Sequence, residues 1–261
     1  MAGSFLRLAV GIFAAAGIWL LSAPAAAPAQ PQDCDVAESF YSFEPTLPNT
    51  IRALASGREV IIAAIGGAST RGGTWGSPEL AWPARLASAL AERVSAARVK
   101  VVNLGVARQT SGEMAGRFDR EVLALKPALV IWETGTMEAV RSTDIEEFRQ
   151  AVQAGLDRLR PAKPEVVLMD MQFSRLTHAV INIDRYVAVL REVADAYDVP
   201  LFPRHDIMRY WAESGILDLR TPDREKRRQL AVRLHECIGR EMADFIVRGA
   251  HPSRPAPGRR R

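Results

Sequence analysis

The chain has 261 residues, of which 48% are hydrophobic and 25% charged, and its formal net charge is +4. This length and composition are those of an ordinary globular protein with one sizeable core, and no linker interrupts the middle of the sequence. Five cations lie near the two ends, and without them residues 30–253 carry a net charge of −1, which argues against nucleic-acid binding: Arg7, Arg254, Arg259, Arg260 and Arg261.

Residues 1–29 have the pattern of a secretory signal peptide. Arg7 precedes an apolar run, and Ala27-Pro28-Ala29 fits a small-x-small cleavage site. The alternative is an uncleaved anchor in the inner membrane, although the apolar run is shorter than the ~20 residues that a membrane span needs. We therefore expect a periplasmic or secreted protein with no stable membrane insertion after cleavage. At the other end, residues 250–261 form a basic, proline-rich tail that we expect to be disordered.

The two cysteines, Cys34 and Cys237, lie far apart in the sequence. On a secretory route they could form a disulfide that joins the mature N-terminus to the last helix. Two free thiols are the alternative. Metal binding by such a distant pair would need His235, so no metal site is predicted.

Apolar strand-like runs alternate with amphipathic helical segments after a polar N-terminal segment, residues 30–58. This alternation predicts an α/β fold in which helices cover both faces of a five-stranded parallel sheet. Ligands bind beyond the carboxyl ends of the strands in such sheets. The strand-like runs are 59–66, 98–105, 128–135, 165–171 and 199–203, and the helical segments are 79–94, 111–125, 145–159, 184–196 and a long terminal helix from Thr221 to about Gly249.

Glycine-bearing turns follow three consecutive strands. They are GGAST with Ser69, NLGVARQT with Gly105, and WETGTMEA with Gly135 and Thr136. The first turn matches neither the dinucleotide pattern GxGxxG nor the phosphate-loop pattern GxxxxGK[ST], and it is not the nucleophile elbow GxSxG. A serine that satisfies local backbone groups in a turn remains the alternative to a nucleophile.

The order of these blocks resembles the SGNH hydrolase superfamily, also called the GDSL esterase/lipase family. The resemblance implies a flavodoxin-like three-layer αβα sandwich over residues 59–249 and an esterase that needs no cofactor. It also implies that Ser69 is the catalytic nucleophile and that the amides of Ser69 and Gly105 form the oxyanion hole. Ala68 stands where an aspartate is usual in the family.

The third block departs from the family pattern. Gly135 and Thr136 match it, but Met137 stands where the family has an asparagine and Glu138 where an aspartate is common. A methionine donates no hydrogen bond, so one oxyanion contact is missing or comes from elsewhere. Four polar residues are candidates for this compensation: Gln109, Glu133, Thr134 and Thr136.

The fourth block, DxxH, is absent. His235 takes the place of the catalytic base in the family order, with Val232 three residues before it, although the surrounding sequence predicts a continuous helix. His178 and His205, which follow the fourth and fifth strands, are alternatives, and Asp206 is not expected to orient its neighbour His205. The acid partner is open among three residues: Asp218, Asp223 and Glu225.

The sequence thus predicts a serine esterase that acts on an acyl ester of a carbohydrate or lipid in the cell envelope. Gln172 and Arg175, after the fourth strand, are further candidates for lining the site. A degenerate member of the fold that binds an envelope glycan or protein without hydrolysing it is the alternative, and Met137 and the missing DxxH block support that alternative. Nucleotide binding is a third possibility, which predicts thermal stabilisation by nucleotide.

Overall fold

The computed structural model places the described part of the chain in one compact unit. The predicted signal peptide and the predicted C-terminal tail lie outside the described residues. Among the described residues of the N-terminal segment, Cys34, Leu47 and Leu54 are buried in the core. The described residues are 34–41, 47–73, 78–94 and 98–248.

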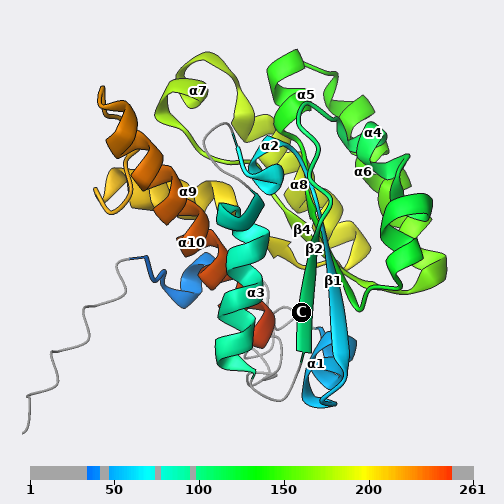
Figure 1. Cartoon of the computed structure of the whole chain (residues 1–261). Coiled ribbons are helices and arrows are strands. Elements are labelled where there is room, and N and C mark those ends of the chain that lie inside the picture. The colour runs from blue at the N-terminus through cyan, green and yellow to red at the C-terminus, as the bar shows by residue number, and fades with distance from the viewer. Residues whose placement is uncertain (1–33, 42–46, 74–77, 95–97, 249–261) are drawn as a thin grey trace, which may run out of the picture. The chain divides into compact units, whose positions relative to one another are not determined.

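The sheet has five parallel strands in the order β2-β1-β3-β4-β5, which confirms the predicted fold class (Figure 1). β2 lies on one side of β1, and the next strand in the chain, β3, lies on the other side of β1. The carboxyl ends of β1 and β3 therefore flank the crevice where this topology binds ligands. The strands are β1 Glu59–Ile65, β2 Arg98–Asn103, β3 Leu129–Glu133, β4 Glu165–Met169 and β5 Leu201–Phe202.

Helices cover both faces of the sheet. α3 and α10 pack together on one face, and α4, α6 and α8 lie on the other (Figure 1). The helices are α1 Pro48–Ala55, α2 Ala68–Arg71, α3 Trp82–Arg93, α4 Ser111–Ala115, α5 Thr136–Arg141, α6 Ile145–Leu159, α7 Arg175–Val180, α8 Ile183–Tyr197, α9 Arg204–Glu213 and α10 Arg224–Arg248.

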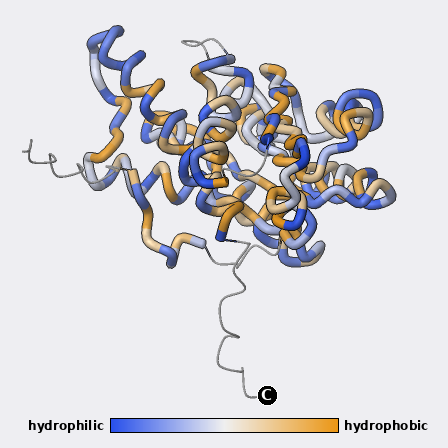
Figure 2. The backbone as a smooth tube through the Cα atoms, turned by 60° about the horizontal axis from the view of Figure 1, so that its bottom comes forward, coloured by the Kyte–Doolittle hydropathy of each residue, from blue (hydrophilic) through white to orange (hydrophobic). Residues whose placement is uncertain are grey.

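Side chains of the central strands alternate between two hydrophobic clusters. Ile62 and Ala64 join the cluster that includes α3 and α10, whereas Ala63 and Ile65 join the cluster that includes α6 and α8. This alternation follows from the two-residue period of a strand, and burial on both faces explains why the run is apolar throughout. The outer helices carry both hydrophilic and hydrophobic stretches, as expected for helices with one buried side (Figure 2).

The prediction of one continuous helix over residues 111–125 is wrong. The structure divides it into α4, a π-helical turn at Phe118–Val122 and a 3-10 turn at Leu123–Leu125. Gly112 and Gly116 lie within this segment, and glycine weakens a helix because it loses the most backbone freedom on ordering.

The terminal helix α10 is unbroken from Arg224 to Arg248. Asp223 precedes it and accepts a hydrogen bond of 2.9 Å from the backbone N–H of Lys226, so Asp223 is the N-cap. The helix begins at Arg224, and the predicted start at Thr221 is wrong. None of the helices between residues 34 and 248 that the structure describes is both long and apolar enough to span a membrane.

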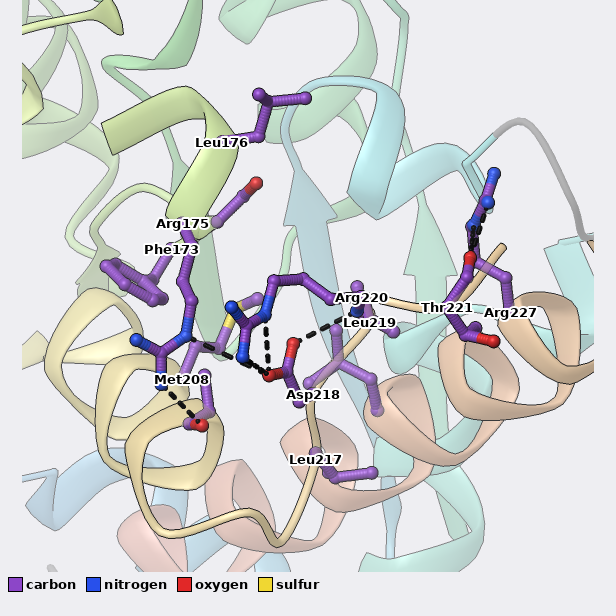
Figure 3. A pocket seen from close by; sticks show the side chains of 13 residues that line it. Phe173, Arg175, Leu176, Met208, Leu217, Asp218, Leu219, Arg220, Thr221 and Arg227 are labelled. Atoms are coloured by element: carbon purple, nitrogen blue, oxygen red, sulfur yellow. Dashed lines mark hydrogen bonds and ion pairs between the residues drawn. The ribbon is translucent and has the colours of Figure 1, made fainter. Parts of the chain in front are cut away.

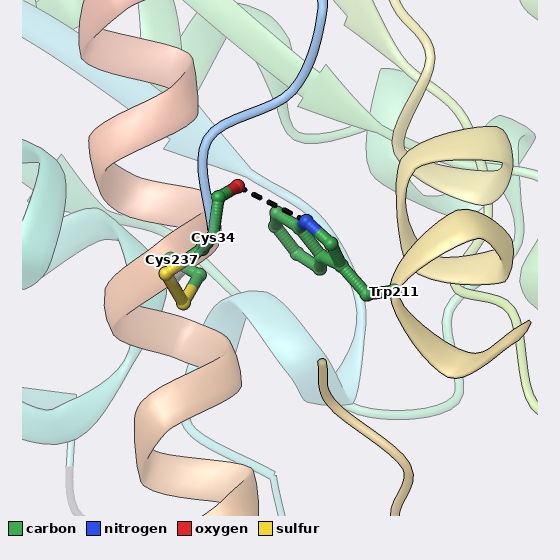
Figure 4. The surroundings of a disulfide bond; sticks show 3 residues. All are labelled: Cys34, Trp211 and Cys237. Atoms are coloured by element: carbon green, nitrogen blue, oxygen red, sulfur yellow. Dashed lines mark hydrogen bonds between the residues drawn. A yellow bond between two sulfur atoms is a disulfide. The ribbon is translucent and has the colours of Figure 1, made fainter. Parts of the chain in front are cut away.

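The predicted disulfide between Cys34 and Cys237 is confirmed (Figure 4). The two Cα atoms are 5.7 Å apart. Trp211 of α9 donates a hydrogen bond of 3.0 Å from its indole N–H to the Cys34 carbonyl, beside the disulfide. The covalent bond and the hydrogen bond together attach the N-terminal segment to α9 and α10.

A buried polar pair forms a second link between the N-terminal segment and α10. The Tyr41 hydroxyl donates a hydrogen bond of 2.5 Å to a carboxylate oxygen of Glu241, which is 5% exposed. Burial is the main cause that raises the pKa of Glu241 from 4.5 to about 7. The folded protein therefore keeps a proton on Glu241 over a pH range in which the unfolded chain has released it.

Glu241→Gln is expected to change the pH dependence of stability. Because the pKa of Glu241 is raised in the folded state, its contribution to stability is complete below pH 4.5 and is lost as the pH rises through about 7. The unfolding free energy of wild type minus that of Glu241→Gln should fall by about 1.4 kcal/mol per pH unit across this window. Urea denaturation at a series of pH values measures this difference.

Exposed Glu236, on the same helix, supplies the matched control, and Glu236→Gln should follow the wild-type profile. Asp170, whose pKa burial also raises to about 7, is present in all three proteins, so its titration cancels in the differences. Parallel profiles for wild type and Glu241→Gln would refute the assignment.

Candidate active site

Ser69 lies at the carboxyl end of β1, in the short helix α2. Glycine is required at Gly66, because a Cβ atom there would lie 2.2 Å from Thr70 Oγ1 and 2.7 Å from a carboxylate oxygen of Glu133. The Ser69 hydroxyl is half-buried and accepts a hydrogen bond of 2.7 Å from the guanidinium of Arg204. The serine is thus held by a permanent positive charge, a contact that the sequence analysis missed.

Arg204 begins α9 directly after β5, and its side chain is only 2% exposed. Its guanidinium forms an ion pair of 3.0 Å with the buried carboxylate of Glu133, at the end of β3. It also donates a hydrogen bond of 3.2 Å to the side-chain oxygen of Gln172, which follows β4. Arg204, which follows β5, therefore connects Ser69 to residues at the carboxyl ends of two other strands, β3 and β4. The only sequence signal was a cation immediately after the fifth strand.

The second block packs against α2. The Asn103 side chain donates a hydrogen bond of 2.7 Å to the carbonyl of Thr70 and accepts one of 2.9 Å from the amide of Gly105. A Cβ atom on Gly105 would lie 2.3 Å from the backbone nitrogen of Arg71, so only glycine fits this close approach. The Gly105 amide, predicted as an oxyanion donor, has Asn103 as its partner here, and its role toward a substrate stays a prediction.

The third block turns from β3 into α5. Gly135 has a φ of 94°, which favours glycine, and the buried Thr136 hydroxyl has no hydrogen-bond partner among the described residues. Glu138 is buried, and its carboxylate accepts a hydrogen bond of 2.5 Å from the amide of Ser111 at the start of α4. Glu138 therefore stabilises the beginning of α4 rather than lining the space next to Ser69.

A cavity of about 110 Å³ opens beside Ser69, and we call it the serine cavity. None of the described histidines lines the serine cavity, but six other candidate residues from the sequence do, namely Gln109, Glu133, Thr134, Thr136, Met137 and Gln172. The cavity is polar on several sides but contains no imidazole. Its lining residues are Gly67, Ala68, Ser69, Arg108, Gln109, Met114, Glu133, Thr134, Thr136, Met137 and Gln172.

His235, the predicted base, lies on α10 and contacts the start of α3. Its Nδ1 accepts a hydrogen bond of 3.2 Å from the backbone N–H of Trp82. Burial and the charges of Arg204 and Arg85 lower the pKa of His235 to about 4. The neutral ring therefore carries its proton on Nε2, whereas the base of a catalytic triad needs that nitrogen free. Within the described ranges no hydrogen bond joins Ser69 to a histidine.

Neither of the two alternative histidines, His178 and His205, lines the serine cavity. His205 is 1% exposed, and its ring packs edge-on against Phe173 with 5.4 Å between centroids. The half-exposed ring of His178, on α7, lies 6.1 Å from the His205 ring. Asp206 Oδ1 lies 3.5 Å from His205 Nδ1, so it is close to the ring but beyond a normal hydrogen-bond length.

A larger cavity of about 430 Å³ lies between α7, α9 and the loop before α10, and we call it the arginine pocket (Figure 3). Asp218 pairs there with Arg220 at 2.8 Å and with Arg175 at 3.9 Å. Arg175, a predicted site residue, therefore lines this cavity instead of the serine cavity. The lining residues are Phe173, Ser174, Arg175, Leu176, Met208, Ala212, Leu217, Asp218, Leu219, Arg220, Thr221, Arg227 and Leu234.

The loop before α10 contains Asp218, one of the acids considered as a partner of the base, but no histidine. Residues 218–221 read DLRT, so Thr221 stands where a DxxH block has histidine. His235 lies well inside α10 and not on this loop. Of the other acids considered as partners, Asp223 caps α10 and Glu225 pairs with an exposed arginine on the surface.

The model of the non-GDSL lipase-like family matches residues 33–252 of the chain. No curated protein matches the chain by sequence. The matched segment contains the turns after β1, β2 and β3 and extends through α10. This match confirms the resemblance to the SGNH hydrolases that the motif order implied.

Solved structures of esterases share the fold. A two-domain esterase active on acetylated mannans aligns at 21% identity with a TM-score of 0.59, covering 79% of this chain and 54% of its own, so the chain spans about half of that enzyme. A variant of Axe2, an acetyl xylan esterase from Geobacillus stearothermophilus, aligns at 18% identity with a TM-score of 0.59, covering 72% and 94%. TesA aligns at 19% identity with a TM-score of 0.57, covering 71% and 99%.

Proposed function

The chain belongs to the non-GDSL lipase-like family, and from that premise we propose that it is an esterase-type serine hydrolase. Ser69 is the nucleophile and the serine cavity receives the acyl group. The observation that carries the proposal is the position of Ser69 at the β1/β3 crevice, beside a polar cavity and a buried arginine. A buried cation at this position suits a reaction in which negative charge develops on oxygen.

In the proposed reaction Ser69 Oγ attacks the ester carbonyl while a base takes its proton, and the base then delivers that proton to the leaving alcohol. The oxyanion forms on the carbonyl oxygen of the carbon that Oγ attacks, so it lies within reach of the Arg204 guanidinium that now contacts Oγ at 2.7 Å. Arg204 would thus supply the donor that Met137 cannot. Water then hydrolyses the acyl-enzyme and restores the serine.

The proton of Ser69 is assigned to His235, the base that the family order implies. In the resting arrangement its Nδ1 accepts from the Trp82 amide, which favours the tautomer with the proton on Nε2. Catalysis therefore requires substrate binding to break this hydrogen bond and to bring an unprotonated imidazole nitrogen toward Ser69. This requirement predicts slow turnover on simple esters.

The size of the serine cavity favours a small acyl group. Its volume of about 110 Å³ is that of roughly four water molecules at ~30 Å³ each, enough for an acetyl group but not for a long chain. One esterase with this fold is active on acetylated mannans, and another is an acetyl xylan esterase. We propose an acylated carbohydrate or lipid of the cell envelope as the substrate, and the disulfide supports a periplasmic or secreted location.

A second candidate is a binding protein that has lost hydrolysis. The surroundings of His235 favour it, because the pKa of this histidine is lowered to about 4 and its Nδ1 is occupied by Trp82. In that case Arg204, Ser69 and Gln172 would bind an envelope glycan by hydrogen bonds.

Ester hydrolysis by wild type and by Ser69→Ala separates the two candidates. The mature protein should release the chromophore from a short-chain chromogenic ester, and Ser69→Ala should lose at least about a thousandfold of that rate. Ser88→Ala, an exposed position on α3, should keep the wild-type rate. If wild type and Ser69→Ala hydrolyse the ester equally, or neither does, the esterase proposal fails.

A further inference from the structure

His178, Asp184 and His205 come from three consecutive helices, α7, α8 and α9, and lie close together. One ligand atom of each residue lies within 4.8 Å of the ligand atoms of the other two. His178 Nε2 is 3.9 Å from a carboxylate oxygen of Asp184. Two imidazoles and one carboxylate form a donor set that zinc accepts in proteins.

His205 is the residue whose environment points to a ligand. Its side chain is 1% exposed, and neither ring nitrogen has a hydrogen-bond partner among the described residues. Buried polar groups normally have such a partner, because burial without one is unfavourable. A metal ion bound to this ring would give one of its nitrogens the partner that it now lacks.

The other two residues provide access from solvent. The side chains of His178 and Asp184 are 38% and 60% exposed. A tetrahedral zinc ion at ~2.0–2.1 Å from each ligand holds the ligand atoms about 3.3 Å apart, closer than their present spread of up to 4.8 Å. Because these two side chains are exposed, they can rotate toward the buried ring of His205 when the ion binds.

We propose that His178, Asp184 and His205 bind a divalent transition metal ion, with Zn²⁺ as the best fit and water completing four-fold coordination. Asp206 Oδ1 lies 3.5 Å from His205 Nδ1. A small approach of this carboxylate on metal binding would let it accept a hydrogen bond from Nδ1–H and leave Nε2 for the metal. No metal site was expected from the sequence, in which these three residues lie on separate helices and form no spacing motif.

The ion would fix α7 against α8 and α9. Arg175 and Leu176 of α7 line the arginine pocket, so the metal would hold one wall of that cavity in place (Figure 3). Arg204, the neighbour of His205 in the chain, contacts Ser69. The proposal does not depend on ester hydrolysis, since metal binding is measured directly.

Isothermal titration of chelator-treated protein without a polyhistidine tag, using Zn²⁺ as the titrant, tests the site. One ion per chain is expected, and His178→Ala and Asp184→Asn should each weaken binding about 100-fold or more. Asp195→Asn, an exposed aspartate on the same helix α8, is the matched control and should bind as wild type does. Co²⁺ in place of Zn²⁺ should give the visible absorption of a tetrahedral ion.

His205→Ala removes a buried side chain and could impair folding, so the decisive variants are the two exposed ligands. The proposal is overturned if the wild type binds no Zn²⁺. It is equally overturned if His178→Ala and Asp184→Asn bind Zn²⁺ as tightly as Asp195→Asn does, since the ion would then lie elsewhere.

Discussion

Arg204→Met is expected to lower the unfolding free energy by about 3–5 kcal/mol, because it leaves the buried carboxylate of Glu133 without its cationic partner. Both side chains are almost fully buried, so water cannot replace the lost ion pair. Glu133→Gln should cause a loss of similar size by leaving the guanidinium unpaired. Urea denaturation, with the slope of the transition compared between variants, measures both effects.

The double variant Arg204→Met/Glu133→Gln is expected to lose less than the sum of the two single losses, because no unpaired charge remains. Arg228→Met removes an arginine from the exposed pair with Glu225 and should leave the urea midpoint close to that of the wild type, because solvent screens this pair. If Arg204→Met lowered the unfolding free energy as little as Arg228→Met does, the account in which the buried ion pair holds the guanidinium at Ser69 would be contradicted.

Loss of the disulfide is the second large effect that we expect. Cys34→Ala/Cys237→Ala should lower the unfolding free energy by about 2–5 kcal/mol, because the bond closes a loop with a sequence separation of 203 residues and restricts the unfolded chain. Chemical denaturation of the variant without reductant gives the value.

Reduction of the wild type should produce the same loss, and reductant should leave the double variant unchanged. A wild type whose denaturation midpoint is unaffected by reductant, although mass spectrometry shows two free thiols, would contradict a stabilising role for the bond. The prediction concerns stability alone, since neither cysteine lines the serine cavity.

The sheet was predictable from the sequence because its strands are buried on both faces. In β1, the run from Val60 to Ile65 is apolar throughout. The helix α6 matches the predicted helix 145–159, because its apolar residues recur at helical spacing and Asp144 caps its N-terminus. The prediction for 111–125 was wrong because Gly112 and Gly116 interrupt a segment that is otherwise helical in pattern.

The candidate site was predictable only in part. Motif order identified Ser69 and several residues of the serine cavity, since each follows a strand that ends at the same edge of the sheet. Arg204 was missed because its importance depends on Glu133, far away in the sequence, and no local pattern reveals a buried ion pair. The tautomer of His235 was equally unpredictable, because it depends on the Trp82 amide that donates a hydrogen bond to its ring.

Covalent labelling tests most directly whether Ser69 is a nucleophile. Folded protein is incubated with a serine-reactive phosphonate, digested and analysed by mass spectrometry. The esterase proposal predicts one adduct, on the peptide that contains Ser69, which is absent from Ser69→Ala and from protein unfolded before labelling. Folded wild type that carries no adduct on Ser69 would contradict it, and the site would then be one that binds a ligand without attacking it.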